Sequence, residues 1–327
     1  MIISKTPLRI SFAGGGTDIK DFFQNRKFGC VVNTTINKYI YIGIHKHFDG
    51  NSFLLKYSKT ESGKDVNKIK HPLFREAMKL TRINGVEIVT MSDVPSKGVG
   101  LGSSSSFLVG LLNALYAYKG KRVAPGILAK QAATIEREIL KEGGGYQDQY
   151  IAAFGGLRFM RFGSDNRFTI KLINCPEKTK KELDQNLIMF YTGITRKSSK
   201  IHIQQQKQID QNFEKLIKIR QLATQLKVDL KKGNIKTFGE SLHQNWLLKK
   251  QLTKEINNPL IDKYYQKAIN AGAAGGKLLG AGGGGFLLFY CEPQKQKSVR
   301  NALSNLEELK FQFEPKGSEI IFDYEND

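Results

Sequence analysis

The stretch Val94-Pro-Ser-Lys-Gly-Val-Gly-Leu-Gly-Ser-Ser-Ser-Ser106 combines three glycines with four consecutive serines. The run Val86–Met91 before it predicts a strand, and the apolar run Phe107–Tyr118 after it predicts a helix. Glycines let a loop approach a ligand closely, and the free N–H groups at a helix start attract anions. This order therefore predicts a phosphate-binding loop. An ordinary glycine turn with a serine helix cap remains the alternative.

Two more glycine-rich turns lie near the ends of the chain. Gly14-Gly-Gly16 follows a predicted strand over residues 1–12, and Gly280-Ala-Gly-Gly-Gly-Gly285 joins two predicted strands. The second turn matches the dinucleotide pattern G-x-G-x-x-G, but that pattern must open a helix, whereas Phe286–Tyr290 predicts a strand. A nicotinamide site is therefore not expected. The pattern G-x-x-x-x-G-K-[ST] is absent, which excludes a P-loop of that type.

The charge balance of the chain favours anionic ligands. The 327 residues include 51 Lys and Arg against 30 Asp and Glu, a formal net charge of +21. The basic residues are spread along the chain without a zinc-finger or RNP motif, so we do not expect nucleic acid as a partner. Phosphorylated small molecules fit the charge, although lysines that only keep the surface soluble would give the same excess.

Cysteine usage and hydropathy predict a cytoplasmic protein. The three cysteines Cys30, Cys175 and Cys291 are far apart, which argues against a disulfide framework and a cysteine metal site. The segment Met1–Pro7 has no long apolar core of a signal peptide. No run approaches the ~20 apolar residues of a membrane helix, so no membrane partner is expected.

The order of the predicted elements indicates an α+β fold with two lobes. Strands dominate the first half, and helices with a small sheet dominate the second. We expect the lobes to span residues 1–174 and 175–327. In a predicted helix over 125–141, residues 128, 132, 135 and 139 form the core stripe; Glu136 lies beside this stripe and Arg137 is expected to point away.

Three motifs in order carry a resemblance to the GHMP kinase superfamily. They are Pro7-Leu-Arg-Ile-Ser-Phe-Ala-Gly-Gly-Gly-Thr-Asp18, the loop Pro95–Ser106, and Lys277-Leu-Leu-Gly-Ala-Gly-Gly-Gly-Gly-Phe286. The resemblance covers essentially the whole chain. It implies a two-lobed fold, with an N-terminal lobe like domain 2 of ribosomal protein S5 and a ferredoxin-like C-terminal lobe. It also implies a phosphotransferase that uses ATP and Mg²⁺.

Within the superfamily, the form Ala13-Gly-Gly-Gly-Thr-Asp18 resembles sugar 1-kinases, namely D-glycero-D-manno-heptose 7-phosphate kinases and the kinase part of L-fucose kinases. The segments Gly144–Tyr150 and Tyr191–Arg196 are most similar to the heptose kinases. The implied reaction phosphorylates the anomeric hydroxyl of D-glycero-α-D-manno-heptose 7-phosphate, in the synthesis of surface polysaccharide precursors. An L-fucose kinase, another GHMP kinase and a non-catalytic sugar sensor remain alternatives. The resemblance implies nothing about the oligomeric state.

The resemblance also implies roles for individual residues. Asp148 would be the catalytic carboxylate, with Arg9 and Lys5 as catalytic cations. Ser104 and Glu136 would hold Mg²⁺. Residues implied to contact the ATP phosphates are Lys97, Gly98, Gly100, Leu101, Gly102, Ser103, Ser104, Ser105 and Ser106. Residues implied to contact the substrate are Gly14, Gly15, Gly16, Thr17, Asp18, Arg196, Gly282 and Gly283. A plain helix cap remains open for Asp18, as does a surface ion pair for Glu136.

Overall fold

The long antiparallel strands β1 (Ile2–Ala13) and β2 (Phe28–Lys46) form the centre of the first sheet. The computed structural model describes residues 1–95, 98–195 and 198–324. The register of β1 and β2 shifts between Pro7 and Leu8. Proline has no N–H group for a ladder, which accounts for an irregularity there. Arg9 follows this irregularity closely along β1.

The first sheet has nine strands among the described residues. Its main order is β13-β1-β2-β5-β3-β4, while β12 and β6 also pair with β2, and β7 pairs with β6. The pairing of β3 with β5 is parallel and the other pairings are antiparallel. The remaining bounds are β3 (Phe53–Lys56), β4 (Thr60–Gly63), β5 (Val86–Ser92), β6 (Arg158–Gly163), β7 (Phe168–Leu172), β12 (Phe313–Glu314) and β13 (Glu319–Asp323).

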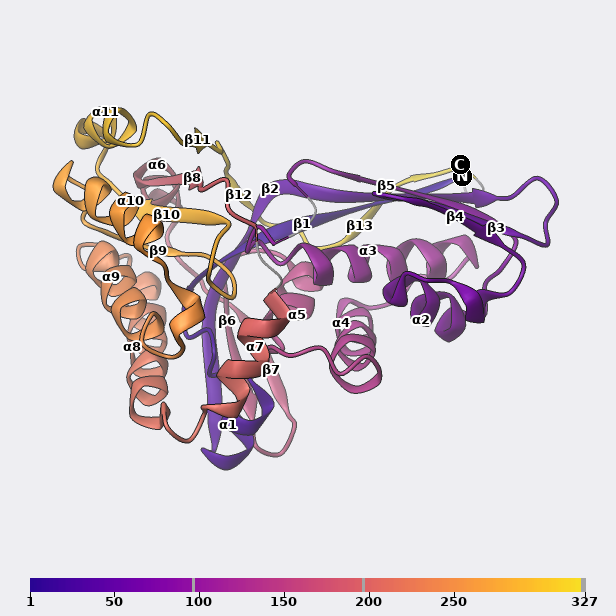
Figure 1. Ribbon diagram of the computed structural model, residues 1–327, viewed down its shortest axis with the longest axis horizontal. Helices are drawn as coiled ribbons and strands as arrows, with labels where there is room; N and C mark the ends of the chain where they lie inside the picture. The colour runs from indigo at the N-terminus through magenta and orange to yellow at the C-terminus, as the bar shows by residue number, and fades with distance from the viewer. Residues whose placement is uncertain (96–97, 196–197, 325–327) are drawn as a thin grey trace.

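Helices cover one face of this sheet. Helix α3, which is mostly apolar after its four serines, lies along β1 and β2, with α2 and α4 beside it (Figure 1). The helical elements of this lobe are α1 (Lys20–Asn25), the 3-10 turn η1 (Val66–Lys68), α2 (Pro72–Thr81), α3 (Ser103–Tyr118), α4 (Pro125–Ala133), the π-helical turn η2 (Thr134–Ile139) and α5 (Gln147–Phe154).

A four-stranded antiparallel sheet in the order β11-β8-β10-β9 forms the second lobe. Its strands are β8 (Leu187–Tyr191), β9 (Gly275–Leu278), β10 (Phe286–Tyr290) and β11 (Glu307–Glu308). The helical elements of this half are α6 (Glu177–Asn186), α7 (Ser198–Lys207), α8 (Phe213–Lys232), α9 (Phe238–Lys249), η3 (Lys254–Ile256), α10 (Pro259–Asn270) and α11 (Pro293–Ala302). No helix in the described ranges is long and apolar enough to cross a lipid bilayer.

The predicted α+β class is confirmed, with mixed sheets and helices in two lobes. The boundary after residue 174 stays a prediction, and two strands beyond it, β12 and β13, return to the first sheet. Strand β13 pairs with β1, placing Ile2 opposite Asp323, and β12 pairs with β2. Met1 and Tyr324, at the two ends of the described chain, consequently lie side by side (Figure 1).

Candidate active site

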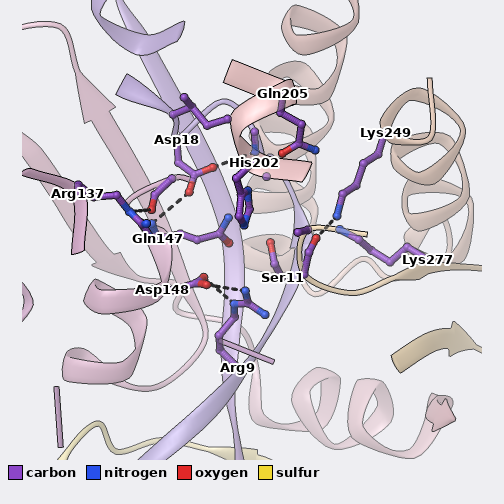
Figure 2. A pocket seen from close by; sticks show the side chains of 16 residues that line it. Arg9, Ser11, Asp18, Arg137, Gln147, Asp148, His202, Gln205, Lys249 and Lys277 are labelled. Carbon is purple, nitrogen blue, oxygen red and sulfur yellow. Dashed lines mark hydrogen bonds and ion pairs between the residues drawn. The ribbon is translucent and has the colours of Figure 1, made fainter. Parts of the chain in front are cut away.

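A polar pocket lies beside the C-terminal half of β1, and residues of both lobes line it. Its walls come from the loop after β1, the turn η2, the start of α5, the helices α7 and α9, and the loop that follows β9 (Figure 2). The lining residues are Arg9, Ser11, Gly15, Gly16, Asp18, Ile19, Arg137, Gly145, Gln147, Asp148, His202, Gln205, Lys249, Lys277, Gly280 and Ala281. Segments distant in sequence therefore converge on one site.

Arg9 and Asp148 form a bidentate ion pair in this pocket. Arg9 Nε donates to Asp148 Oδ1 at 2.7 Å, and Nη2 donates to Oδ2 at 2.7 Å. Burial alone would raise the pKa of Asp148, but the charge and hydrogen bonds of Arg9 bring this pKa below its ordinary value. The Arg9 side chain is only 6 % exposed and that of Asp148 is 22 % exposed. The carboxylate is therefore ionised, oriented and still accessible.

Arg9 also contacts the glycine loop that precedes α3. Its Nη1 donates to the carbonyl oxygen of Gly100 at 2.6 Å, and its backbone N–H donates to the carbonyl of Leu101 at 3.0 Å. One side chain thus joins the predicted catalytic carboxylate to the predicted phosphate loop.

The loop before α3 has the conformation that its glycines favour. Gly98, Gly100 and Gly102 all have positive φ, and Gly102 caps the N-terminus of α3. A serine cap was the alternative, but none of the serines makes a side-chain cap bond there. The serines instead form the first turn of α3, whose N–H groups have few partners within the helix. The start of α3 therefore keeps donors for an anion.

The four serines point in different directions. Ser104 Oγ donates to Glu136 Oε1 at 2.8 Å, and Ser105 Oγ donates to Glu136 Oε2 at 2.7 Å. Ser106 Oγ donates to the carbonyl of Pro7, which ties α3 to β1. Ser103 Oγ is buried without a partner among the described residues. Ser104 is the exposed serine of the four, so a ligand at the helix start can reach it.

Glu136 is buried at 1 % exposure, which excludes the surface ion pair left open above. It lies in the π-helical turn η2, and Gln149 Nε2 also donates to it. Its neighbours Ser104 and Ser105 supply oxygen donors, the type that Mg²⁺ prefers. The described residues contain no group of three His, Cys, Asp or Glu able to hold a metal. An ion here would take two protein ligands and fill its shell from phosphates and water.

Asp18 lies in the pocket wall and does not cap α1. Helix α1 begins after Ile19 without a side-chain cap. Asp18 Oδ1 accepts from Gly16 N at 2.9 Å, and Oδ2 accepts from Gln147 N at 3.1 Å. A Cβ atom on Gly145 would lie 1.9 Å from Oδ2, so only glycine fits beside this carboxylate. Burial, followed by the charge of Asp148, raises the pKa of Asp18.

The wall of the pocket near α5 and α7 carries three buried polar atoms without a partner among the described residues. They are Ser11 Oγ, Gln147 Oε1 and His202 Nδ1. Burial, and then the charge of Arg137, lowers the pKa of His202 to about 4, so its ring is neutral at pH 7. Unpaired buried polar atoms are rare in proteins. Together with the sparse apolar lining, they suit a ligand rich in hydroxyl groups.

Two buried lysines enter the same pocket from the second lobe. Lys249, at the end of α9, is 6 % exposed, and its Nζ donates to the carbonyl of Gly280. Lys277, in β9, is 2 % exposed, and its Nζ donates to the carbonyl of Phe12 at 2.8 Å. The second bond crosses from the second lobe to β1.

Comparisons with known proteins show the family of the chain. The family models described as GHMP kinases N terminal domain and GHMP kinases C terminal match residues 67–156 and 226–308. A D-glycero-alpha-D-manno-heptose 7-phosphate kinase of Campylobacter jejuni is 32% identical over 322 residues, covering 92% of this chain and 93% of its relative. The chain belongs to the GHMP kinase family.

Solved structures agree with this assignment. A D-glycero-D-manno-heptose 1-phosphate kinase from Bacteroides thetaiotaomicron aligns with a TM-score of 0.81 and 27% identity, over 98% of this chain and 99% of its own. A Streptococcus pneumoniae phosphomevalonate kinase, solved with phosphomevalonate and AMPPNP, has a TM-score of 0.75 at 19% identity, over 96% of this chain and all of its own. The latter likeness shows the fold alone. As a member of the GHMP kinases, the chain is a phosphotransferase.

The structure does not bring every residue implied by the GHMP resemblance to the pocket. Lys5 forms an ion pair with Glu319 at 3.0 Å and does not line the pocket. Gly282 and Gly283 pack against Ile256, to which Gly283 donates a backbone bond, while Gly280 and Ala281 line the pocket in their place.

Two further residues of that set, Gly14 and Thr17, are not among the lining residues of the pocket. Thr17 Oγ1 donates to the carbonyls of Gly14 and Cys30, so both Thr17 and Gly14 hold the loop against β2. Lys97 and Arg196 lie outside the described residues.

Several lining residues were not predicted. Arg137 was expected to point away, but it lines the pocket and donates to the carbonyls of Glu142, Gly143 and Gly145. The prediction assumed α-helical spacing, whereas residues 134–139 form a π-helical turn, which changes the direction of each side chain. Lys249 carried a usable signal, since it continues the apolar stripe Phe238, Leu242, Trp246 at helical spacing.

Proposed function

We propose that this chain is an ATP-dependent sugar 1-kinase that phosphorylates the anomeric hydroxyl of D-glycero-α-D-manno-heptose 7-phosphate. The observation that carries the proposal is the contact of Arg9 with both Asp148 and Gly100, which joins a carboxylate to a phosphate-type loop. The name of the Campylobacter jejuni relative supports the choice of heptose 7-phosphate. The unpartnered polar atoms Ser11 Oγ, Gln147 Oε1 and His202 Nδ1 support a polyhydroxylated acceptor.

In this proposal the loop Gly98–Ser106 and the start of α3 bind the triphosphate of ATP. Bound Mg²⁺ would be held by Ser104 and Glu136 and would neutralise phosphate charge. Asp18 accepts a hydrogen bond from a sugar hydroxyl, with Gly15 and Gly16 beside it in the pocket wall. The same proposal places the reaction in the cytoplasm, where ATP is held.

Asp148 orients the attacking hydroxyl and receives its proton. The hydroxyl oxygen forms a bond to the γ-phosphorus while the bond from that phosphorus to the ADP oxygen breaks, and the proton passes to Asp148 and then to solvent. The lowered pKa of Asp148 makes it a weak base, so the proton moves late, after the new bond has formed. Arg9 stabilises the negative charge of the transferring group.

The names of the two heptose kinase relatives differ in the position of the existing phosphate, 7-phosphate in one and 1-phosphate in the other. A coupled ADP-release assay separates the candidates with a panel of heptose 7-phosphate, heptose 1-phosphate, L-fucose, galactose and mevalonate. We expect turnover with heptose 7-phosphate, and a product whose anomeric proton couples to phosphorus by NMR. Turnover of L-fucose without turnover of heptose 7-phosphate would replace the proposal with its alternative, an L-fucose kinase.

A further inference from the structure

The charges that line the pocket do not balance. Arg9, Arg137, Lys249 and Lys277 are basic, whereas Asp18 and Asp148 are the only acidic lining residues that the structure describes. Asp148 is already paired with Arg9, and the oxygens of Asp18 accept backbone N–H groups. The two lysines are therefore left without a carboxylate partner, and neither takes part in an ion pair of the described residues.

Each lysine also has unused donors. An ammonium group has three N–H donors, and the described contacts of Lys249 and Lys277 are one backbone carbonyl each. A buried cation without a counter-ion is costly, and two neighbouring ones also repel each other. Both lysines enter the pocket from the same side, opposite Asp18 and Arg137 (Figure 2). A bound anion between the two ammonium groups would offset the cost of burying them and their repulsion for each other.

We propose that Lys249 and Lys277 form a phosphoryl-binding subsite on the second-lobe side of the pocket. This subsite is additional to the loop Gly98–Ser106 and to Arg9. It rests on the proposed sugar-phosphate kinase reaction, which supplies two phosphoryl groups, the one transferred from ATP and the one that the sugar already carries. The lysine pair binds one of these two phosphoryl groups, and a series of variants or ligands identifies which one.

The protonation of Lys249 gives a direct readout. Burial, followed by the charge of Arg9, lowers its pKa to about 8, against the opposing charges of Asp18 and Asp148. Burial, followed by the charges of Lys249 and Arg9, lowers the pKa of Lys277 well below its ordinary value. The charged or titratable groups that act on Lys249 from the elements around it are Arg9, Asp18, Asp148, His202 and Lys277. An anion beside the pair favours the charged forms and raises both pKa values.

The experiment is an NMR titration of the unaltered chain labelled at the lysine ε-carbons. Lys249 is assigned from the signal lost in Lys249→Arg. The first probe is sulfate, which does not titrate near pH 8. We expect sulfate to raise the pKa of Lys249 by about one unit or more. Lys250 is the internal control, because it lies next in sequence and pairs with Asp262 at 3.4 Å on the surface; its signal should not move. An unchanged Lys249 pKa in saturating sulfate would overturn the proposal.

Further arms of the titration identify the source of the phosphoryl group. If the pKa of Lys249 rises with AMPPNP and Mg²⁺ in the absence of sugar, the subsite is assigned to the transferred phosphoryl group. A rise with heptose 7-phosphate, but not with unphosphorylated heptose, assigns it to the phosphate of the sugar. A rise with sulfate but with none of these ligands would mean that the lysine pair holds neither phosphoryl group, which would also overturn the proposal. Because the sulfate arm needs no turnover, a chain inactive on heptose 7-phosphate would refute the proposed reaction without deciding the subsite.

Steady-state kinetics provide an independent test. We expect Lys249→Met to raise KM for the ligand whose phosphate it holds by about tenfold or more, with partial recovery in Lys249→Arg. Lys250→Met is the matched control and should leave KM unchanged. A circular dichroism spectrum like that of the unaltered chain shows that Lys249→Met is folded. A folded Lys249→Met with unchanged KM for both substrates would contradict the assignment.

Discussion

Gly100 and Gly280 are in direct backbone contact between the loop before α3 and the loop after β9. A Cβ atom on Gly280 would lie 2.4 Å from the Cα of Gly100, and one on Gly100 would lie 2.6 Å from the carbonyl oxygen of Leu279. Neither position can carry a side chain without moving a backbone. The second and third of the three GHMP kinase motifs thus support each other's conformation in this chain.

This contact predicts that Gly100→Ala is more damaging than an alanine at another glycine with positive φ. Gly100 and Gly120 have φ values of 80° and 69°, so alanine costs each about 1–2 kcal/mol of backbone strain. A Cβ on Gly120 meets nothing within 4 Å, which makes Gly120→Ala the matched control. Urea unfolding should show a larger loss for Gly100→Ala, accompanied by weaker AMPPNP binding. Equal losses in the two variants would contradict the role of the contact.

Asp148→Asn tests the catalytic carboxylate. Asparagine keeps the shape and one acceptor for Arg9, but it removes the charge and the proton acceptor. We expect kcat to fall by roughly 10²–10⁴, with AMPPNP binding preserved. The measurement is kcat with the preferred sugar, and unchanged activity would show that Asp148 is not the catalytic group.

Arg9→Lys separates charge from geometry. Lysine keeps the positive charge but cannot make the two bonds to Asp148 and the third to Gly100. We expect a fall in kcat of about tenfold or more, together with a loss of about 1–3 kcal/mol in unfolding free energy. Lys5→Met on the same strand is the comparison, because Lys5 pairs with Glu319 away from the pocket. A comparable loss of kcat in Lys5→Met would return Lys5 to the catalytic set.

Glu136→Gln should weaken the response to magnesium. The substitution keeps the size of the buried side chain and removes its charge, so the Mg²⁺ concentration for half-maximal activity should rise. Glu138→Gln is the matched control, since Glu138 lies two residues away and is exposed. A magnesium titration of both variants checks this expectation. Identical magnesium curves for the two variants would argue against a metal ligand at Glu136.

His202 predicts an acid-sensitive contribution to stability. Its pKa in the folded chain is lowered to about 4, below the ordinary 6.5, so the unfolded chain binds the proton more readily. The neutral ring does not lower the free energy of unfolding above pH 6.5. As the pH falls toward 4 the loss grows, and at pH 4 it reaches about 3 kcal/mol. Unfolding free energies between pH 7 and pH 4 should therefore fall less steeply in His202→Gln. Parallel pH profiles for the two proteins would contradict a neutral, buried ring.

The sequence predicted the features that follow from local patterns. The strand, loop and helix around Gly98–Ser106 and the α+β class needed only periodicity, glycine positions and the likeness of three motifs. The π-helical turn at residues 134–139 could not be read from α-helical spacing, so Arg137 was placed on the wrong side. Lys277 was quoted as part of a motif without a role, because nothing local shows that its ammonium reaches Phe12 in another lobe.

The pairing of β13 with β1 has a consequence for synthesis of the chain. Arg9 lies on β1, and one edge of that strand is completed over Ile2–Lys5 by residues 319–323. The ribosome makes residues 319–323 after the other strands of the first sheet, so the start of β1 stays without this neighbour until they emerge. Contacts between such distant segments form slowly. The emerging chain therefore exposes an open sheet edge beside the start of β1 until β13 has docked.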